Sequence, residues 1–141
     1  CSVSAQPPSL LVCVNEESGV CGIIQDNGVM CVNVLRAEQA YISDAFSGRL
    51  TDPDANPFAC TDWETTVSGA PVMSKALINL DCRIKNELHH GTHYIFVGEI
   101  ESLKLNQPGA PLVYRARMYE QLGESGSLSL EDMEYSWERY T

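Results

Sequence analysis

The chain has 141 residues, of which 44% are hydrophobic, and its formal net charge is −10 at pH 7. This length suits one domain with a substantial core, and the apolar content argues against disorder. The acidic charge disfavours non-specific binding to nucleic acid and to anionic membrane surfaces, because both require clustered Lys and Arg. No apolar run approaches the roughly 20 residues of a membrane-spanning helix, and no signal peptide is visible. We therefore expect a cytoplasmic protein that binds neither nucleic acid nor membrane.

The cysteines are even in number but lack C-x-x-C spacing; they stand at positions 1, 13, 21, 31, 60 and 82. Zinc sites and redox dithiols usually need such close pairs, so we assign neither. Cys13, Cys31 and Cys82 lie in apolar strand-like runs, where buried free thiols are common. A chain of this size does not depend on a disulfide framework. The pattern therefore indicates a reducing compartment.

Residues 9–35 carry the strongest pattern, which reads as strand, loop, short helix and strand. The two strands are the apolar runs 10–14 and 29–35. Between them, residues 18–27 show apolar side chains at helical spacing, and Asn27-Gly28 supplies a left-handed stop. We expect the remaining elements to be arranged around this unit.

The start of that helix and the segment before the first strand both bear on ligand binding. A helix that begins at Ser18 and Gly19 presents free backbone N–H groups, which can hold a phosphate without a cation. The alternative is an ordinary helix cap at the same residues. Residues 1–6 are small and polar and precede Pro7-Pro8, so we expect a loop that enters the strand.

The middle of the chain predicts a second helix and then irregular structure. An amphipathic helix over residues 36–46 stops at Ser47-Gly48. Residues 49–57 are rich in Asp, Asn and Pro and predict a surface loop. Residues 58–71 continue without a regular pattern, and Trp63 is expected to anchor them.

The second half of the chain predicts strands. Apolar and polar residues alternate from 78 to 84, which is typical of a strand with one buried face. Strands joined by tight turns form an antiparallel meander of the kind found in barrels and sandwiches. The expected order is a strand over 72–85, a turn at 87–91, a strand over 92–105, a turn at 106–109 and a strand over 111–119.

The last segment, 123–141, differs from the rest of the chain. It begins with a linker-like Gly-Glu-Ser-Gly-Ser run and then predicts a short amphipathic helix capped by Ser129. The apolar stripe of this helix comprises Leu130, Met133, Trp137 and Tyr140. Such a stripe usually docks on its own domain or on a second subunit. We therefore divide the chain into a domain over 1–122 and a C-terminal linker and helix over 123–141.

Six sequence blocks follow one another in an order that resembles a known family. They are CSVSAQPPSLLVCVN, the short helix after it, GVMCVNVL, a second helix ending in AFSG, GTHYIFVGEI and PLVYRARMY. Over residues 1–122 the chain resembles the short-chain flavin reductases. The resemblance is closest to the reductase components of two-component flavin monooxygenases such as 4-hydroxyphenylacetate 3-monooxygenase.

The resemblance implies a mainly β protein with short helices, folded as an FMN-binding split β-barrel and acting as a homodimer. Such enzymes move a hydride from NADH or NADPH to FMN or FAD, and the reduced flavin then leaves for a separate monooxygenase. The cofactors carry the reactivity, so the protein has only to stack the two ring systems and hold them. No nucleophile and base pair is therefore expected.

The resemblance also implies site residues, by matching position in this sequence. His93 matches the family histidine near the nicotinamide and flavin rings and is the expected catalytic residue. Tyr114 and Arg117 match the last strand, near the nicotinamide nucleotide. The residues implied to contact the flavin are Cys1, Ser2, Val3, Ser4, Asn15, Ser18, Gly19, Val20, Asn33, Phe46 and Ser47.

Plainer roles remain open for several of these residues. Phe46 suits the core at a helix end, and His93 suits an ordinary hydrogen-bonded position. Arg117 is either a cross-strand charge partner or a contact to a dinucleotide phosphate. The histidines at 89, 90 and 93 straddle a turn and have no apparent fourth ligand, so we assign no metal.

Two features depart from the family pattern. Family members begin with a stretch that forms the first strands and ends in Thr-Ala before the position of Cys1, and this stretch is absent here. Without it we expect an open barrel edge and a flavin site that lacks one wall. Glu16 and Glu17 lie beside the expected phosphate position, where repulsion on the order of 1 kcal/mol favours a flavin that binds as a passing substrate.

Three functions are compatible with these patterns. The first is an NAD(P)H-dependent flavin reductase, and the second is the same barrel binding flavin or haem without turnover. The third is a dimerisation domain that has lost the site. The sequence does not choose between FMN and FAD, and the lack of an Arg cluster for a 2′-phosphate is only a faint indication against NADPH.

Overall fold

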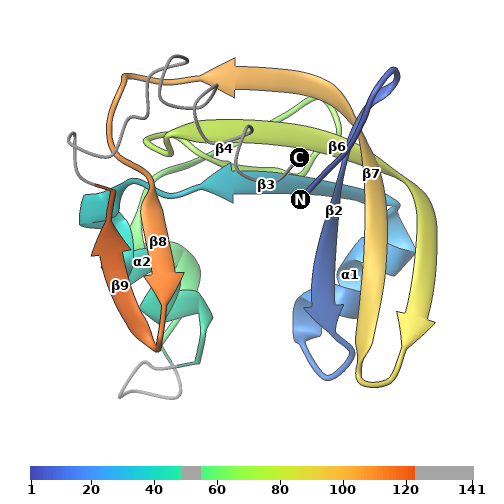
Figure 1. The fold of residues 1–141 in the computed structure, drawn as a ribbon, viewed down its shortest axis with the longest axis horizontal. Coiled ribbons are helices and arrows are strands. Elements are labelled where there is room, and N and C mark those ends of the chain that lie inside the picture. The colour runs from blue at the N-terminus through green and yellow to red at the C-terminus, as the bar shows by residue number, and fades with distance from the viewer. Residues whose placement is uncertain (49–54, 123–141) are drawn as a thin grey trace, which may run out of the picture.

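The computed structural model describes residues 1–48 and 55–122, which form a mainly β fold with two short α-helices (Figure 1). The helices are α1 (Gly19–Asn27) and α2 (Ala40–Phe46), and the 3₁₀ segments are η1 (Ala37–Gln39) and η2 (Pro57–Cys60). The strands are β1 (Ser2–Ala5), β2 (Pro8–Asn15), β3 (Val29–Val34), β4 (Trp63–Thr65), β5 (Pro71–Met73), β6 (Ile78–His90), β7 (His93–Leu105), β8 (Leu112–Arg115) and β9 (Met118–Gln121).

Five strands form one antiparallel sheet in the order β1-β2-β7-β6-β3. The pairs β4-β5 and β8-β9 form separate two-stranded sheets. The long strands β6 and β7 run the whole length of the main sheet and bend along it (Figure 1). Within the described residues β1 and β3 are the edges of this sheet. The predicted mainly β class is confirmed.

The unit at the start of the chain folds as predicted from β2 onward. Helix α1 ends at Gly28, which has the left-handed φ of 65° and donates its N–H to the carbonyl of Ile24 at 2.8 Å. The expected loop at residues 1–6 was wrong, because Ser2–Ala5 forms β1 and pairs with β2. Small polar side chains carry no strand signal in the sequence. Residues 2–5 form a strand because their backbone pairs with the edge of β2.

The meander predicted in the second half is wrong in three places. The expected strand over 72–85 is divided, because β5 ends at Met73 and belongs to another sheet, and β6 begins only at Ile78. Strand β6 continues through the expected turn to His90, and the turn lies at Gly91-Thr92, where Gly91 has a φ of 60°. The expected third strand is a hairpin of its own, β8-β9, which turns at Ala116 and Arg117 with φ values of 51° and 65°. Positive φ values at both central residues are typical of a two-residue hairpin turn. Such turns usually contain Asn or Gly, so Ala116 and Arg117 gave no sequence signal for this one.

The main core lies between α1 and one face of the sheet. Its buried members are Leu10, Cys21, Ile24, Met30, Cys82 and Phe96. Cys82 is buried as predicted, whereas Cys13 is exposed and Cys31 is half-buried, which corrects the expectation for those two thiols. Cys13 lies on the face of β2 opposite to Leu10, because successive side chains of a strand alternate between its faces.

A second part of the molecule is built around α2, η2 and the β8-β9 hairpin. Ile42, Met73 and Ala76 form its small core. The predicted anchor Trp63 packs against Phe58 with ring centroids 5.1 Å apart and donates its indole N–H to the Phe58 carbonyl at 2.9 Å. We call this part the hairpin lobe, and we call β1, β2, α1 and the paired ends of β6 and β7 the sheet lobe. Figure 1 shows the two lobes at opposite ends of the molecule.

Arg36 fastens the hairpin lobe to the end of the main sheet. Its guanidinium donates to the carbonyls of Gln107 at 2.7 Å and Pro108 at 3.1 Å, and its Nε lies 2.6 Å from Oε1 of Glu38. These carbonyls belong to the connection between β7 and β8. The backbone of Leu112 also donates to the carbonyl of Leu35 at 2.9 Å. The Arg36 side chain and this backbone bond together therefore fix the direction in which the chain leaves the sheet.

Two predicted segments lie outside the described residues. They are the part of the surface loop at 49–54 and the whole C-terminal linker and helix over 123–141. In the ranges that the structure describes, no helix is long and apolar enough to cross a membrane.

Candidate functional site

Asn15 and His93 form a direct cross-strand pair where β2 and β7 meet. Residues paired in this way project their side chains from the same face of the sheet. Both residues are exposed, and Nδ1 of His93 lies 2.9 Å from the hydroxyl of Thr92. The next residue across the sheet is His90, which pairs with His93. The predicted catalytic residue thus lies on the sheet face that α1 does not cover.

An apolar row lies next to this polar pair. Cys13 pairs with Ile95, and Ile95 pairs with Leu88, so the three side chains lie side by side on the same face. Cys13 is exposed, and Leu88 is 61% exposed. Leu11 and Val97 extend the row one pair further along β2 and β7. A flat apolar surface with a polar edge is suited to contact with a planar ring.

The loop from Asn15 to Val20 directs the chain into α1. The Asn15 side-chain oxygen accepts the N–H of Glu17 at 2.8 Å, and the Asn15 carbonyl accepts the N–H of Ser18 at 3.0 Å. Ser18 is the N-cap, with extended φ and ψ of −72° and 127°, and its side chain makes no capping bond. Gly19 and Val20 lie in the first turn of α1. Their backbone N–H groups have no carbonyl acceptor within the helix.

Glu16 is paired, contrary to the simple repulsion expected from the sequence. Its Oε2 lies 2.8 Å from Nε2 of His89, and its backbone N–H donates to the carbonyl of Thr92 at 3.0 Å. The His89 ring stacks on Tyr94 with centroids 4.5 Å apart and an interplanar angle of 21°. This carboxylate is therefore held on the β6-β7 hairpin.

The first four residues lie along the edge of the sheet lobe. The N-terminal ammonium of Cys1 donates to the carbonyl of Leu11 at 3.0 Å, and Ser2 pairs with Leu10. The hydroxyl of Ser4 accepts the N–H of Gln6 at 3.1 Å, while Val3 is 47% exposed. These residues are in the same lobe as Asn15 and His93.

The other predicted residues lie in the hairpin lobe. Phe46 contacts Phe58 edge-to-face, with centroids 5.1 Å apart, and the hydroxyl of Ser47 donates to the Asp44 carbonyl at 3.1 Å. Tyr114 packs on Tyr119 at 5.2 Å. Arg117 lies at the tip of the hairpin.

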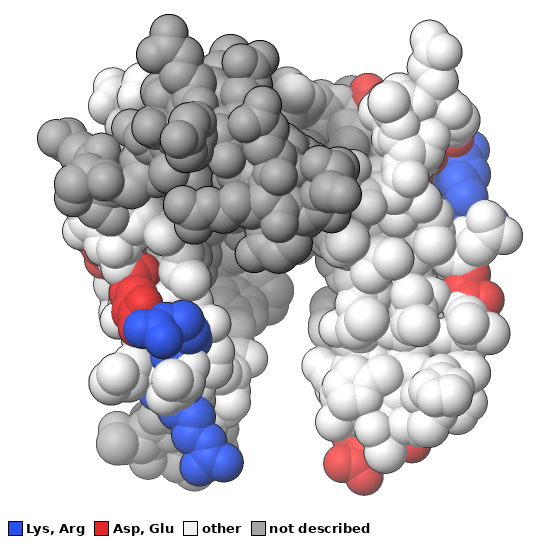
Figure 2. All heavy atoms as spheres, in the orientation of Figure 1, with Lys and Arg blue, Asp and Glu red and all other residues white. Residues whose placement is uncertain are grey.

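The two groups of predicted residues therefore lie in different lobes. Figure 2 shows an open cleft between the lobes, with Arg side chains and a neighbouring acidic side chain over the β8-β9 hairpin and a largely uncharged surface on the facing lobe. A single described chain does not bring all of the predicted residues into one pocket.

Asn33 has a structural environment that the sequence did not reveal. Its side-chain oxygen accepts the N–H of Met73 at 3.0 Å and the side-chain amide of Asn79 at 2.7 Å. Its own amide donates to the carbonyl of Pro71 at 3.3 Å. These bonds join β3 to β5 and β6, which favours a structural role for the residue.

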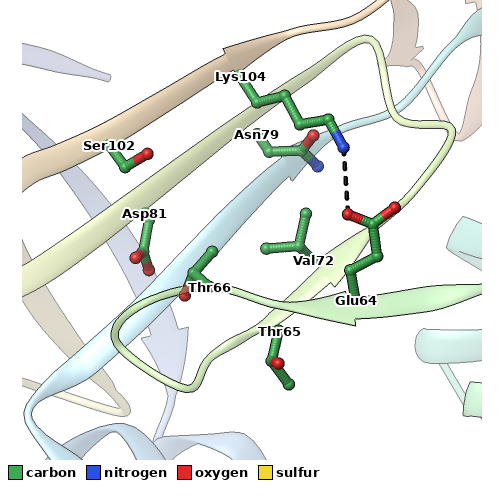
Figure 3. A pocket seen from close by; sticks show the side chains of 8 residues that line it. All are labelled: Glu64, Thr65, Thr66, Val72, Asn79, Asp81, Ser102 and Lys104. Carbon is green, nitrogen blue, oxygen red and sulfur yellow. Dashed lines mark hydrogen bonds and ion pairs between the residues drawn. The ribbon is translucent and has the colours of Figure 1, made fainter.

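A small polar cavity of about 150 Å³ lies between the β4-β5 hairpin and the main sheet (Figure 3). Lys104 and Glu64 form an ion pair at 3.2 Å at one side of it. The buried carboxylate of Asp81 accepts the Ser68 hydroxyl at 2.6 Å. Pockets for drug-sized ligands usually measure about 300–1,000 Å³, so this cavity is too small for a flavin. The residues lining it are Glu64, Thr65, Thr66, Val72, Asn79, Asp81, Ser102 and Lys104, none of which was predicted to contact the flavin.

Two thiols beside this region are kept protonated. Burial, and then the Asp81 carboxylate, raise the pKa of Cys31 to about 11. Burial, and then Cys31 and Asp81, raise the pKa of Cys82 to about 11. A thiol with so high a pKa is a poor nucleophile at neutral pH. Neither thiol therefore suggests covalent catalysis.

Comparison with known proteins decides the family, because residues 1–123 match the flavin reductase like domain. The chain belongs to this flavin reductase family. It is 38% identical to the FMN reductase (NADH) RutF of Agrobacterium fabrum over 122 residues, which are 86% of this chain and 69% of the relative. It is 36% identical to the 4-hydroxyphenylacetate 3-monooxygenase reductase component of Pseudomonas aeruginosa, again over 86% of this chain and over 72% of that protein.

A solved flavin reductase structure shows the same fold. The NADH:FAD oxidoreductase SgcE6 of Streptomyces globisporus, in complex with NAD and FAD fragments, superposes with a TM-score of 0.79 at 25% identity. The match covers 89% of this chain and 74% of that one. The predicted family and the split-barrel fold class are thereby confirmed. The contact of individual residues with flavin or nicotinamide remains a prediction.

Sequence reasoning about the flavin reductase site missed the partner of Glu16. His89 lies on a strand that was expected to be a turn, so its contact with Glu16 could not be anticipated. Residues 85–90 are polar except for Leu88, so they carry no alternating pattern that would signal a strand. The exposed apolar row was missed because Leu88 lies in the same segment.

Proposed function

We propose that this protein reduces FMN or FAD by hydride transfer from NADH or NADPH and supplies the reduced flavin to a separate monooxygenase. The family membership and the named activities of the two relatives support this proposal. The structural observation that carries it is the pairing of Asn15 with His93, beside an exposed apolar row and next to the start of α1. We infer a cytoplasmic location from the free cysteines and the sequence.

The residues of the sheet lobe fit a flavin nucleotide in chemistry. Apolar side chains suit its ring system, and the N–H groups of Gly19 and Val20 suit its phosphate. A bound flavin supplies the hydride acceptor. Asn15 would orient the flavin through its side-chain amide, and His93 would donate a hydrogen bond at the ring edge where negative charge develops. Ser18, the uncapped N-cap, has a hydroxyl available for the phosphate.

Residues of the hairpin lobe fit the nicotinamide nucleotide. Tyr114 is 50% exposed and offers an aromatic face, and Arg117 offers a cation at the hairpin tip. Arg suits phosphate oxygens because its planar fork donates two parallel hydrogen bonds. We therefore propose that these two residues hold the hydride donor across the cleft from the flavin.

We further propose that the protein is a homodimer. The apolar row of Leu88, Ile95 and Cys13 forms a face that a monomer would leave in water. A second copy that covers the Leu88 end of the row would leave the Cys13 end for the flavin ring and would add a wall to a site that is open in a single chain. Light scattering coupled to gel filtration measures this directly. We expect twice the mass of the chain for the wild type and a shift to monomer for Leu88→Glu.

An oxidation assay tests the proposed activity. Protein is mixed with NADH and free FMN or FAD in air, and the absorbance of the nicotinamide band is followed. We expect continuous loss of NADH, with more than one turnover per protein chain. A stable coloured complex without NADH consumption would instead indicate a flavin- or haem-binding protein. No binding of either ligand would indicate a dimerisation domain.

A further inference from the structure

Glu16 is tied at two points to the hairpin between β6 and β7. Its carboxylate lies 2.8 Å from Nε2 of His89, and its backbone N–H donates to the Thr92 carbonyl at 3.0 Å. The His89 ring is itself fixed, because it stacks on Tyr94 with centroids 4.5 Å apart. The position of this carboxylate is therefore set by a residue more than seventy positions away in the chain.

The position of Glu16 matters because the start of α1 is close in sequence. Only Glu17 separates Glu16 from the N-cap Ser18, and the first turn of α1 carries no acidic residue. Unpaired backbone N–H groups and the helix dipole attract an anion at this end. A carboxylate free to move there would compete with an anionic ligand for the same N–H groups and would repel it.

We propose that His89 is a positioning residue that holds the Glu16 carboxylate on β6 and so keeps one of the two neighbouring carboxylates, Glu16 but not Glu17, away from the start of α1, where the phosphate of a flavin nucleotide would bind. The inference rests on the proposed function and adds to it a preference for phosphorylated flavins over riboflavin. Binding of a phosphorylated flavin depends on His89, whereas binding of riboflavin, which has no phosphate, does not. His89 contacts neither flavin ring in this scheme and acts only through Glu16.

The variant His89→Phe tests the proposal. Phenylalanine keeps a flat ring to stack on Tyr94 but cannot donate to Glu16. We expect the Kd for FMN to rise about 3- to 10-fold, the size of a like-charge repulsion in partly wet surroundings, and the Kd for riboflavin to stay within about twofold. Titration of flavin fluorescence at fixed low ionic strength measures both constants.

A second substitution separates charge from structure. In the double variant His89→Phe with Glu16→Gln, the freed side chain is neutral, so we expect FMN affinity to return to the wild-type value. The matched control is Glu87→Gln, which removes one negative charge from the same strand, where Glu87 contacts Gln25 at 3.4 Å. We expect the control to leave the ratio of the FMN and riboflavin constants unchanged.

Each outcome decides between the alternatives. An unchanged FMN constant in His89→Phe would overturn the inference, as would an equal loss of riboflavin binding or a failure of Glu16→Gln to restore affinity. Wild-type protein that binds neither flavin would overturn the proposed function and the inference together. The two failures are therefore distinguishable.

Discussion

Asn15 and His93 lie directly opposite each other where the last residue of β2 meets the first residue of β7. The two residues are far apart in the sequence, and only the register of the antiparallel pair joins them. The polar pair ends the apolar row formed by Cys13, Ile95 and Leu88. The arrangement places a hydrogen-bonding group at the margin of a surface that suits a planar ligand.

Replacing His93 with Ala should slow NADH oxidation by flavin about tenfold or more, because one preorganised donor is lost where charge develops. The Kd for FMN should stay within about twofold, since ring contact and phosphate binding remain. Steady-state assays and fluorescence titration measure the two effects. His90→Ala is the matched control and should keep its turnover rate. A normal rate in His93→Ala would remove this residue from the site.

Gly98→Ala should destabilise the fold by about 1–3 kcal/mol through overpacking. A Cβ at this position would lie 2.7 Å from Cε of Met30 and 2.9 Å from Cβ of Cys82, and the second of these atoms cannot move away easily. Gly22→Ala, on α1, meets nothing within 4 Å and should stabilise the fold by about 0.5–1 kcal/mol. Urea unfolding of both variants checks the contrast, and equal midpoints would contradict it.

Asn33→Ala should lower the free energy of unfolding by about 1–3 kcal/mol, because the N–H of Met73 and the amide of Asn79 lose their acceptor. If the role of Asn33 is structural, the FMN constant of the folded variant stays near the wild-type value. Asn86→Ala, at an exposed position of β6, is the control and should change stability little. A loss of flavin affinity without a loss of stability would restore Asn33 to the flavin site.

The protein should lose stability between about pH 9 and pH 11. The ordinary thiol pKa is 9.0, and burial raises the pKa of Cys31 and of Cys82 to about 11. The folded state therefore holds these protons more tightly than the unfolded chain does, and this contribution is complete below pH 9 and lost as the pH rises through 11. Thermal melts across this range measure the fall. The double variant Cys31→Ala with Cys82→Ala should show a shallower fall, and an identical slope would contradict the assignment.

The parts of the fold that were predictable are those with local signals. Helix α1 was placed correctly because its apolar spacing and the Asn27-Gly28 stop agree with each other. Strand β1 and the polar end of β6 were missed because their pairing is decided by neighbouring strands rather than by their own side chains. The β8-β9 hairpin was missed because its turn residues, Ala116 and Arg117, are not those that usually adopt positive φ.

The candidate site was predictable only as a set of residues, through the family resemblance. The sequence held no information on which of them lie in the same lobe, because register and lobe placement depend on long-range pairing. It suggested that Glu16 would repel a phosphate, yet the structure pairs this carboxylate with His89. Phe46 packs against Phe58 and Trp63, and this contact keeps its core role open beside the flavin role.

The contacts of Arg36 have a mechanical consequence. One guanidinium joins the β7-β8 connection to η1 and thereby sets the angle at which the hairpin lobe leaves the sheet. A shorter residue at this position would remove both carbonyl contacts, and the bond of 2.8 Å from the Tyr119 hydroxyl to Asp44 and the backbone bond from Leu112 to Leu35 would remain to hold the hairpin. The width of the opening between the lobes therefore depends in part on a residue that lies outside the predicted flavin and nicotinamide contacts.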